Sequence, residues 1–211
     1  MTLNEQQIKA IVDKIVGEMG GNGGDIPVGI SNRHIHLSRE HVDILFGKGY
    51  KLTPIKDLSQ PGQFACEEKV TVIGPKGAIK ASVLGPTRPA DQVELSFTDA
   101  RVIGVAGVPV RESGDVANTP GCTLEGPCGS VTISEGVIVA KRHIHMTPAD
   151  AEALGVVDKE IVNVKLDTAR PLVFGDVVVR VNKNFALAMH IDTDECNAAC
   201  AFGEVYGEIV K

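Results

Sequence analysis

The chain has 211 residues, of which 43% are hydrophobic and 23% charged, a composition that fits a globular protein with a sizeable core and excludes a disordered chain. A net charge of −6, no Trp, two Tyr and six Phe argue against nucleic-acid binding, which needs basic surface and aromatic stacking platforms. No apolar run approaches the roughly 18 residues of a membrane span, so we expect no membrane contact. Without a secretion signal, and with an odd number of cysteines, five, we expect a cytoplasmic protein with free thiols.

The charge is unevenly distributed along the chain. Residues 26–111 contain 11 basic and 8 acidic residues, whereas residues 112–211 contain 8 basic and 15 acidic residues. The first half therefore has the composition to offer a basic pocket to an anionic small molecule.

The chain begins with a pattern typical of an amphipathic helix. Over residues 1–19, apolar side chains recur at spacings of three to five and charged side chains occupy the other side. The glycine-rich segment 20–27 follows as a flexible linker. Two interpretations are open at this point: the helix docks back on the body or mediates self-association, or it is a detachable peptide that binds a partner protein.

Beyond the linker, the pattern is that of a mainly β protein. Short segments rich in Val and Ile, bounded by Gly, Pro and Asp, predict two small antiparallel β-barrels. The predicted strands cover residues 69–74, 78–85, 92–97, 101–107, 136–146, 160–166, 176–181 and 185–191. Short capping helices are predicted over 38–49 and 147–155, the second with Thr147 as N-cap, Pro148 at the first helical position and Gly155 past its end.

An internal repeat is the most informative feature of the sequence. RHIHLS at residues 33–38 recurs as RHIHMT at residues 142–147, and the match continues into the predicted helices, where Leu45 corresponds to Leu154. Each copy reads as a strand carrying His-x-His followed by a capped helix. The repeat therefore predicts two half-sites related by a pseudo-twofold axis.

The two His-x-His motifs indicate metal binding. Because side chains alternate along a strand, His34 and His36 point to one face, about 7 Å apart along the chain, and so do His143 and His145. Paired imidazoles on one face commonly hold Zn²⁺, which accepts His nitrogen and carboxylate oxygen. Four of the six His residues lie in these motifs, which favours ligands over isolated core histidines.

Each His pair needs at least one more ligand. His190, at the end of the predicted strand 185–191, is the candidate for one pair. Glu94 is the candidate for the other, because its carboxylate faces away from its apolar neighbours Val93 and Leu95. The cysteines remain an alternative source of ligands. Three protein ligands leave a metal with an open position, which is typical of a catalytic site.

Two further features favour an anionic substrate. Arg88 lies in the tight loop GPTRP (85–89), and the guanidinium fork matches two oxygens of a phosphate. After His190, a short helix with Thr193 as its expected N-cap would direct its N-terminus at an anion. No Walker, dinucleotide-binding, HExxH or GxSxG motif is present in the sequence, so those reaction classes lack support.

Four segments resemble the PduL-type phosphotransacylases (phosphate propanoyltransferases): SNRHIHLS, GPTRPADQVELS, AKRHIHMTPADA and FALAMHIDTDECNAA. The resemblance covers roughly residues 26–211 and includes both His-x-His copies. It implies that the enzyme interconverts short-chain acyl-CoA plus phosphate with acyl phosphate plus CoA. Propanoyl-CoA is the expected substrate, with acetyl-CoA as an alternative.

The resemblance also implies a zinc-dependent site with two Zn²⁺ ions per chain at the junction of the barrels. One ion would be held by His34, His36 and Glu94, and the other by His143, His145 and His190. Arg88 would bind phosphate. The residues implied to approach CoA are Ser31, Asn32, Arg33 and Asn197.

The resemblance further implies a domain plan and a location. Residues 23–32 and 141–211 would form the first barrel and residues 33–140 the second. Family members inside bacterial microcompartments carry a helix and linker like residues 1–22, so residues 1–20 would bind shell or cargo proteins. The enzyme would then lie within a microcompartment of the bacterial cytoplasm, in a pathway such as propanediol degradation. The sequence leaves the acyl preference and the oligomeric state open, with a homo-oligomer as one alternative.

The expected mechanism is attack by a bound phosphate on the thioester carbonyl, with zinc and Arg88 neutralising and orienting the phosphate. Two rival interpretations remain. One is a zinc hydrolase that uses water in the open metal position. The other is a non-enzymatic module in which zinc joins the two barrels.

Overall fold

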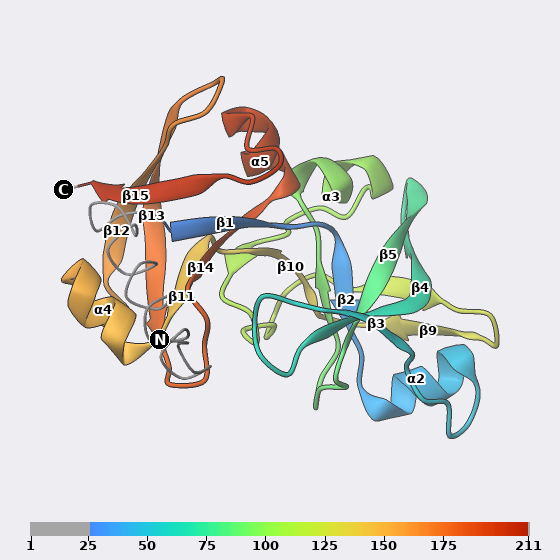
Figure 1. Cartoon of the computed structure of the whole chain (residues 1–211). Helices are drawn as coiled ribbons and strands as arrows, with labels where there is room; N and C mark the ends of the chain where they lie inside the picture. Colours follow the sequence, from blue (N-terminus) through green and yellow to red (C-terminus); the bar gives the residue numbers. More distant parts are fainter. Residues whose placement is uncertain (1–25, 211) are drawn as a thin grey trace, which may run out of the picture.

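The computed structural model describes residues 26–210. The predicted helix over residues 1–19 and most of its linker lie outside the described residues. Within them the mainly β class is confirmed: the strands form two sheets, and four short helices lie at their margins (Figure 1). No helix among these residues has the length and apolar character needed to cross a membrane.

Six strands form a closed barrel in the order β1-β14-β11-β13-β12-β15. Their bounds are β1 Ile26–Ser31, β11 His143–Met146, β12 Ile161–Leu166, β13 Leu172–Val181, β14 Ala188–Asp192 and β15 Tyr206–Val210. Strand β12 alternates strictly between exposed and buried residues, because one face of a barrel strand packs in the core and the other meets solvent.

The second sheet has nine strands and the form of a half-barrel, with the path β7-β10-β6-β2-β5-β4-β8-β9 and β3 paired to β4. The bounds are β2 His34–His36, β3 Pro54–Asp57, β4 Phe64–Gly74, β5 Gly77–Gly85, β6 Gln92–Glu94, β7 Val110–Arg111, β8 Cys122–Glu125, β9 Ser130–Ile133 and β10 Val137–Ala140.

Both sheets are mixed, which corrects the expectation of purely antiparallel sheets. Strand β2 lies between β5, to which it is parallel, and β6, to which it is antiparallel. Strand β11 likewise lies between parallel β13 and antiparallel β14. Each His-x-His strand is therefore inserted between two strands that follow it later in the chain, and no hairpin turn fixes its direction.

The four helices are short and capped by side chains. They are α2 Arg39–Phe46, α3 Phe97–Ile103, α4 Pro148–Leu154 and α5 Thr193–Ala199. The predicted caps of α4 are confirmed, since Thr147 caps its N-terminus and Gly155 adopts the left-handed conformation after its end.

Two local predictions were wrong. The predicted strand over 101–107 is instead the last turn of helix α3 followed by a loop. The Ser96 side chain accepts a hydrogen bond from the Asp99 amide at the start of the helix, and Gly104, with a φ of 78°, ends it. The N-cap of α5 is Asp192 rather than Thr193, since the aspartate forms a reciprocal capping box with Glu195.

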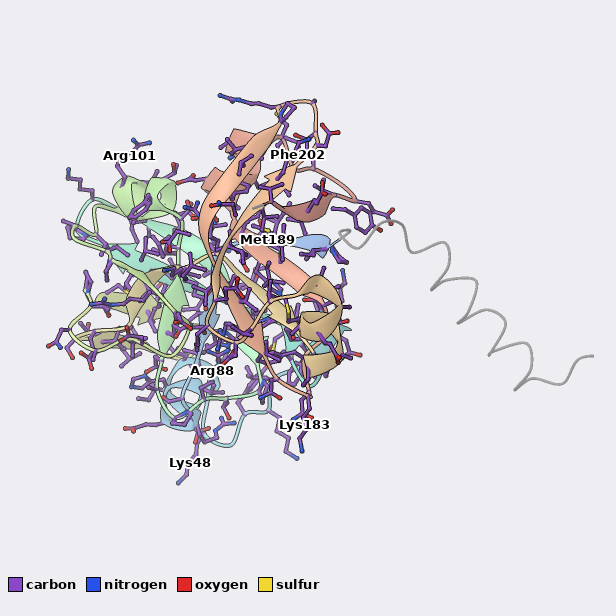
Figure 2. All side chains as sticks on the ribbon, turned by 90° about the vertical axis from the view of Figure 1, so that its left-hand side faces the viewer. Lys48, Arg88, Arg101, Lys183, Met189 and Phe202 are labelled. Atoms are coloured by element: carbon purple, nitrogen blue, oxygen red, sulfur yellow. The ribbon has the colours of Figure 1, made fainter. Side chains whose placement is uncertain are left out.

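Each sheet encloses its own apolar cluster. Met189 lies at the centre of the molecule with none of its surface exposed (Figure 2), whereas Phe202 is 63% exposed. The separate clusters are compatible with the predicted domain division, which stays a prediction.

The chain crosses between the two sheets at two points that position the candidate site. Strand β1 of the barrel continues through Asn32 and Arg33 into β2 of the second sheet, and β10 continues through Lys141 and Arg142 into β11 of the barrel. Each crossing ends on a His-x-His motif. The fold thereby places the start of both motifs at the junction of the sheets (Figure 1).

Candidate metal centre

The first group of candidate ligands is His34, His36 and Glu94. The two histidines alternate on β2 with Ile35, which is fully buried in the core, so both imidazoles face away from the apolar cluster. Glu94 on β6 lies opposite His34 in the antiparallel register. Its carboxylate is 3.3 Å from His34 Nε2 and 4.0 Å from His36 Nε2.

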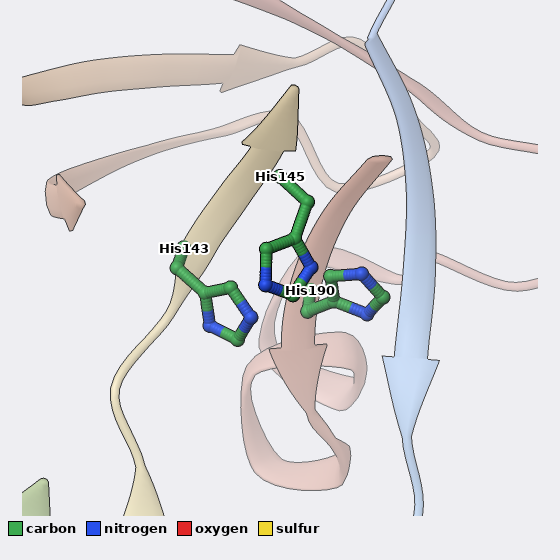
Figure 3. A group of neighbouring side chains, drawn as sticks. All are labelled: His143, His145 and His190. Atoms are coloured by element: carbon green, nitrogen blue, oxygen red, sulfur yellow. The ribbon is translucent and has the colours of Figure 1, made fainter. Parts of the chain in front are cut away.

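The second group is His143, His145 and His190, and it repeats the same plan. His143 and His145 alternate on β11 with the fully buried Ile144, and His190 on β14 lies opposite His143 in the antiparallel register. The ring centroids are 4.5 to 5.1 Å apart. Figure 3 shows the three rings gathered between the two strands.

The crossing segments orient the first histidine of each motif. Nδ1 of His34 lies 2.8 Å from the Asn32 carbonyl oxygen, and Nδ1 of His143 lies 2.8 Å from the Lys141 carbonyl oxygen. When Nδ1 carries the proton and donates it, Nε2 keeps its lone pair for a ligand. The same backbone contact, two residues upstream of the first histidine, is present in both copies.

The donor sets fit a bound cation. In each group, one potential ligand atom per residue lies within 4.8 Å of the others. Zn–N bonds of about 2.0–2.1 Å place tetrahedral ligands about 3.3 Å apart, so a small contraction closes either group. Across residues 26–210, the buried atoms without a hydrogen-bond partner include Nδ1 of His36, Nδ1 of His145 and Nε2 of His190. Such orphaned nitrogens are costly unless a ligand occupies them. Neither group contains a cysteine.

Electrostatics keep most of these imidazoles neutral. Burial, followed by neighbouring imidazoles, lowers the pKa of His36 to about 3 and the pKa of His145 to about 2. Burial and the charge of His143 lower the pKa of His190 to about 4. At neutral pH the three rings therefore carry no proton that would compete with a metal ion.

His34 and Glu94 behave as a coupled pair. Burial opposes protonation of His34, but the Glu94 carboxylate outweighs it and raises the pKa of His34. Burial likewise favours the neutral acid of Glu94, but the adjacent imidazoles and Arg88 hold its pKa well below the usual range. The carboxylate is thus ionised and available as a ligand.

Arg88 is held beside the first group by a polar network. Its guanidinium donates to Ser113 Oγ at 3.1 Å. The amide of Gln92 donates to the same Ser113 oxygen at 2.8 Å and to Glu94 at 2.5 Å. Through Ser113 and Gln92, the arginine and the carboxylate ligand are fixed relative to each other.

A cavity of about 540 Å³ contains both groups. Its lining also includes Arg88 and the predicted CoA residues Ser31, Asn32 and Arg33. The predicted CoA residue Asn197 is exposed on α5 and is not part of the lining. The structure therefore brings together all the predicted site residues except Asn197.

The lining or supporting residues missed from the sequence include Arg180, Ser113, Gln92 and Phe185. Arg180 lies among valines on β13, and Gln92 lies on the same strand face as Glu94. Both could have been predicted in the way that Glu94 was, as a polar residue within an apolar strand. Ser113 lies in a loop and Phe185 lies just before β14. No local sequence pattern marks either residue as part of a site.

Comparisons with known proteins identify the family of this chain. The family model described as phosphate propanoyltransferase matches residues 27–202. A phosphate propanoyltransferase of Listeria monocytogenes is 50% identical over 99% of this chain and 98% of its own length. The phosphate propanoyltransferase of Thermotoga maritima is 57% identical over 82% of this chain and 83% of its own length. That of Leptotrichia buccalis is 52% identical over the full length of both chains. The chain therefore belongs to the phosphate propanoyltransferase family, whose members are phosphotransacylases.

Proposed function

We propose that this phosphate acyltransferase works with two zinc ions, one held by His34, His36 and Glu94 and the other by His143, His145 and His190. An enzyme of this family transfers an acyl group between acyl-CoA and phosphate. We further propose propanoyl as the preferred short acyl group, with acetyl as the alternative.

One observation carries the proposal: two groups with the same strand plan and with orphaned ring nitrogens face a single cavity, and one of them adds an ionised carboxylate. A core histidine would be expected to find a hydrogen-bond partner for its buried nitrogens. Three protein ligands also leave a tetrahedral ion with an open position.

The residues of the chain then have separate roles in the reaction. Arg88, steadied by Ser113, binds the incoming phosphate and neutralises its charge. Ser31, Asn32 and Arg33 lie along the crossing segment and approach CoA. The approach of phosphate and thioester in one cavity supplies proximity and electrostatic stabilisation. Bound zinc would supply Lewis-acid polarisation of an oxygen.

Direct attack by phosphate fits the site better than an acyl-enzyme. The lining of the cavity contains no cysteine. Burial also raises the pKa of Cys66 to about 11 and the pKa of Cys122 to about 12, so neither thiol ionises readily. The CoA thiolate is a good leaving group, and the chain needs no strong general acid to expel it.

The test is release of CoA thiol from a panel of acetyl-, propanoyl- and butanoyl-CoA, with and without inorganic phosphate. We expect release that depends on phosphate and is fastest with propanoyl-CoA. Release without phosphate would support the hydrolase interpretation instead. No turnover with any acyl-CoA by a protein that retains its metal would support the non-enzymatic module.

We also propose that the enzyme is packaged in a bacterial microcompartment through residues 1–20. Support comes from the amphipathic pattern and the glycine-rich linker of the sequence.

A further inference from the structure

The cavity lining is partly polar and partly apolar. Arg88, Ser113 and Arg180 are polar lining residues, beside which a phosphate would bind. The apolar lining residues include Ile30, Leu58, Ala65, Leu84 and Phe185. The acyl chain is the apolar part of the substrate nearest to the reacting carbon. It should therefore lie against an apolar lining residue that contacts the candidate ligands.

Phe185 is a lining residue whose ring contacts a candidate ligand directly. Its half-buried ring packs on the ring of His145, with the two centroids 4.2 Å apart and the planes tilted by 49°. An acyl carbon bound beside His145 would contact this ring. The length of the acyl chain that fits the cavity then depends on how far the Phe185 ring extends into it.

A hydrogen-bonded latch between the two sheets fixes the position of Phe185. The Gln60 side chain donates to the Ala186 carbonyl at 3.1 Å and accepts from the Ala186 amide at 3.3 Å. Gln60 is only 5% exposed, which makes loss of either bond costly. It belongs to the loop after β3, closed by the bond from the Leu58 amide to the Gln63 carbonyl, whereas Ala186 precedes β14. The latch therefore ties the segment carrying Phe185 to the second sheet.

We propose that Phe185 determines the acyl-chain length that the enzyme accepts, and that Gln60 is a positioning residue that acts through it. This inference rests on the proposed function, in that acyl transfer takes place in this cavity. It adds a specificity determinant to that function. The acyl group is recognised by apolar contact with the Phe185 ring and not by a polar group.

The experiment measures kcat/KM for acetyl-, propanoyl- and butanoyl-CoA in full-length Phe185→Ala, together with bound metal. Because one methylene in an apolar pocket changes discrimination by about 10- to 200-fold, the butanoyl-to-propanoyl ratio should rise at least about tenfold. The phosphate KM and the metal content should stay unchanged. Phe202→Ala is the matched control, since Phe202 is 63% exposed and outside the cavity lining, and it should keep the wild-type ratio.

Two further variants separate a specificity role from a supporting one. Phe185→Leu keeps an apolar cover on His145 and should shift the ratio in the same direction by a smaller factor. Gln60→Ala should also shift the butanoyl-to-propanoyl ratio. The double variant with Phe185→Ala should have nearly the same ratio as Phe185→Ala alone, because both substitutions act on the contact between Phe185 and the acyl chain.

The outcomes distinguish this inference from the proposed function. An unchanged acyl profile in both Phe185 variants, with phosphate-dependent turnover intact, would overturn the inference alone. Loss of metal with equal loss of activity on every acyl-CoA would also overturn it, by making Phe185 a support of His145. Failure of the wild-type enzyme to show phosphate-dependent thiol release would instead refute the proposed function.

Discussion

Glu94 and His190 hold corresponding positions opposite the first histidine of each motif, but one is an anion and the other a neutral ring. A divalent ion together with its three ligands would have a lower net positive charge in the first group than in the second, because only the first group contains a carboxylate. The second ion would then be the stronger Lewis acid, and the first would be bound with help from the carboxylate charge.

Replacing Glu94 by Gln should remove one ion. The amide keeps the shape of the side chain but loses the ionised oxygen that attracts the cation, so we expect about one metal equivalent per chain to be lost and activity to fall at least about 100-fold. Elemental analysis and thiol release measure the two effects. Glu67→Gln, at an exposed position of β4, is the control and should keep both ions.

Replacing Arg88 by Ala should impair phosphate binding without loss of metal. Removing a charge-assisted contact costs about 1.5–3 kcal/mol, which corresponds to a phosphate KM or kcat/KM changed by about 10- to 100-fold. Arg101→Ala removes an exposed guanidinium on α3 and should leave the kinetics unchanged. Normal phosphate kinetics in Arg88→Ala would remove the basis for its role.

The lowered pKa values of His36, His145 and His190 predict acid sensitivity of the metal-stripped protein. Above pH 6.5 these rings are neutral in both folded and unfolded chains, so they add no pH dependence. Below pH 6.5 the unfolded chain binds protons that the folded chain rejects until the pH approaches the pKa of about 4 for His190. Stability therefore falls as the pH falls, by on the order of 2 kcal/mol at pH 5 for each ring that stays neutral.

Urea unfolding of the chelator-treated protein at pH 8 and pH 5 measures this effect. The raised pKa of His34 stabilises the folded chain at low pH, and it therefore reduces the total loss of stability between pH 8 and pH 5. A metal-loaded sample should lose less stability over pH 6.5 to 5 if the ions remain bound, because bound metal keeps the rings unprotonated. Equal stability of the stripped protein at both pH values would contradict the prediction.

Among single residues, the candidate metal ligands were predictable from the sequence because each stands out against an apolar strand. His34 and His36 flank Ile35, and Glu94 follows Val93 in the same way. Ser113 was not predictable, since its role depends on a hydrogen bond to Arg88, 25 residues away along the chain. Asn197 was predicted near CoA by resemblance, and its exposed position on α5 gives that role no added support.

At the scale of elements, the arginine of each R-H-x-H copy connects its strand to a helix. Arg33 pairs with Asp99 of α3 at 3.2 Å, and Arg142 pairs with Glu195 of α5 at 2.8 Å. In both copies the helix begins a few residues after the third candidate ligand. The repeat thus uses its arginines to hold those helices, which gives Arg33 a structural partner besides its place in the cavity lining.

Arg142→Ala should loosen α5 and with it the strand that carries His190. Its guanidinium also donates to the Gly175 carbonyl at 2.7 Å, and its removal leaves the partly buried Glu195 with the Asp192 amide but without its ion-pair partner. We expect a loss of about 1–3 kcal/mol in the free energy of unfolding and weaker binding of the second ion. Arg39→Ala, which removes an exposed pair with Asp43 on α2, should cost at most about 0.5 kcal/mol.

The elements predicted best were those with their own end signals. Thr147, Pro148 and Gly155 delimit α4 in the sequence and in the structure. Helix α3 was missed because Val102 and Ile103 within RVIG favour a strand locally, and the cap at Ser96 decided otherwise. The parallel pairing of β2 and β11 was not predictable, since it depends on partners distant in sequence.

On the scale of the whole molecule, the candidate centre depends on two sheets meeting correctly. Besides the two crossings, contacts across the junction include the Gln60–Ala186 latch, the bond from the Thr98 amide to Asp194 at 2.9 Å and the pair of Lys159 with Glu112 at 2.8 Å. Each sheet brings one ligand group, and only the assembled molecule brings both to one cavity.

Deleting residues 1–20 should leave catalysis unchanged, because the described site lies within residues 26–210. It should abolish co-purification with microcompartment shells in cells that form them. Kinetics of the purified truncated enzyme and its distribution between shell and soluble fractions measure the two effects. A truncated enzyme that loses activity would favour a helix that docks back on the body.

The most direct test of the central claim measures metal content and phosphate-dependent thiol release on one purified sample before and after chelation. The account predicts two divalent ions per chain, loss of activity as they are removed, and recovery when zinc is returned. A metal-free sample that keeps full phosphate-dependent activity would contradict it.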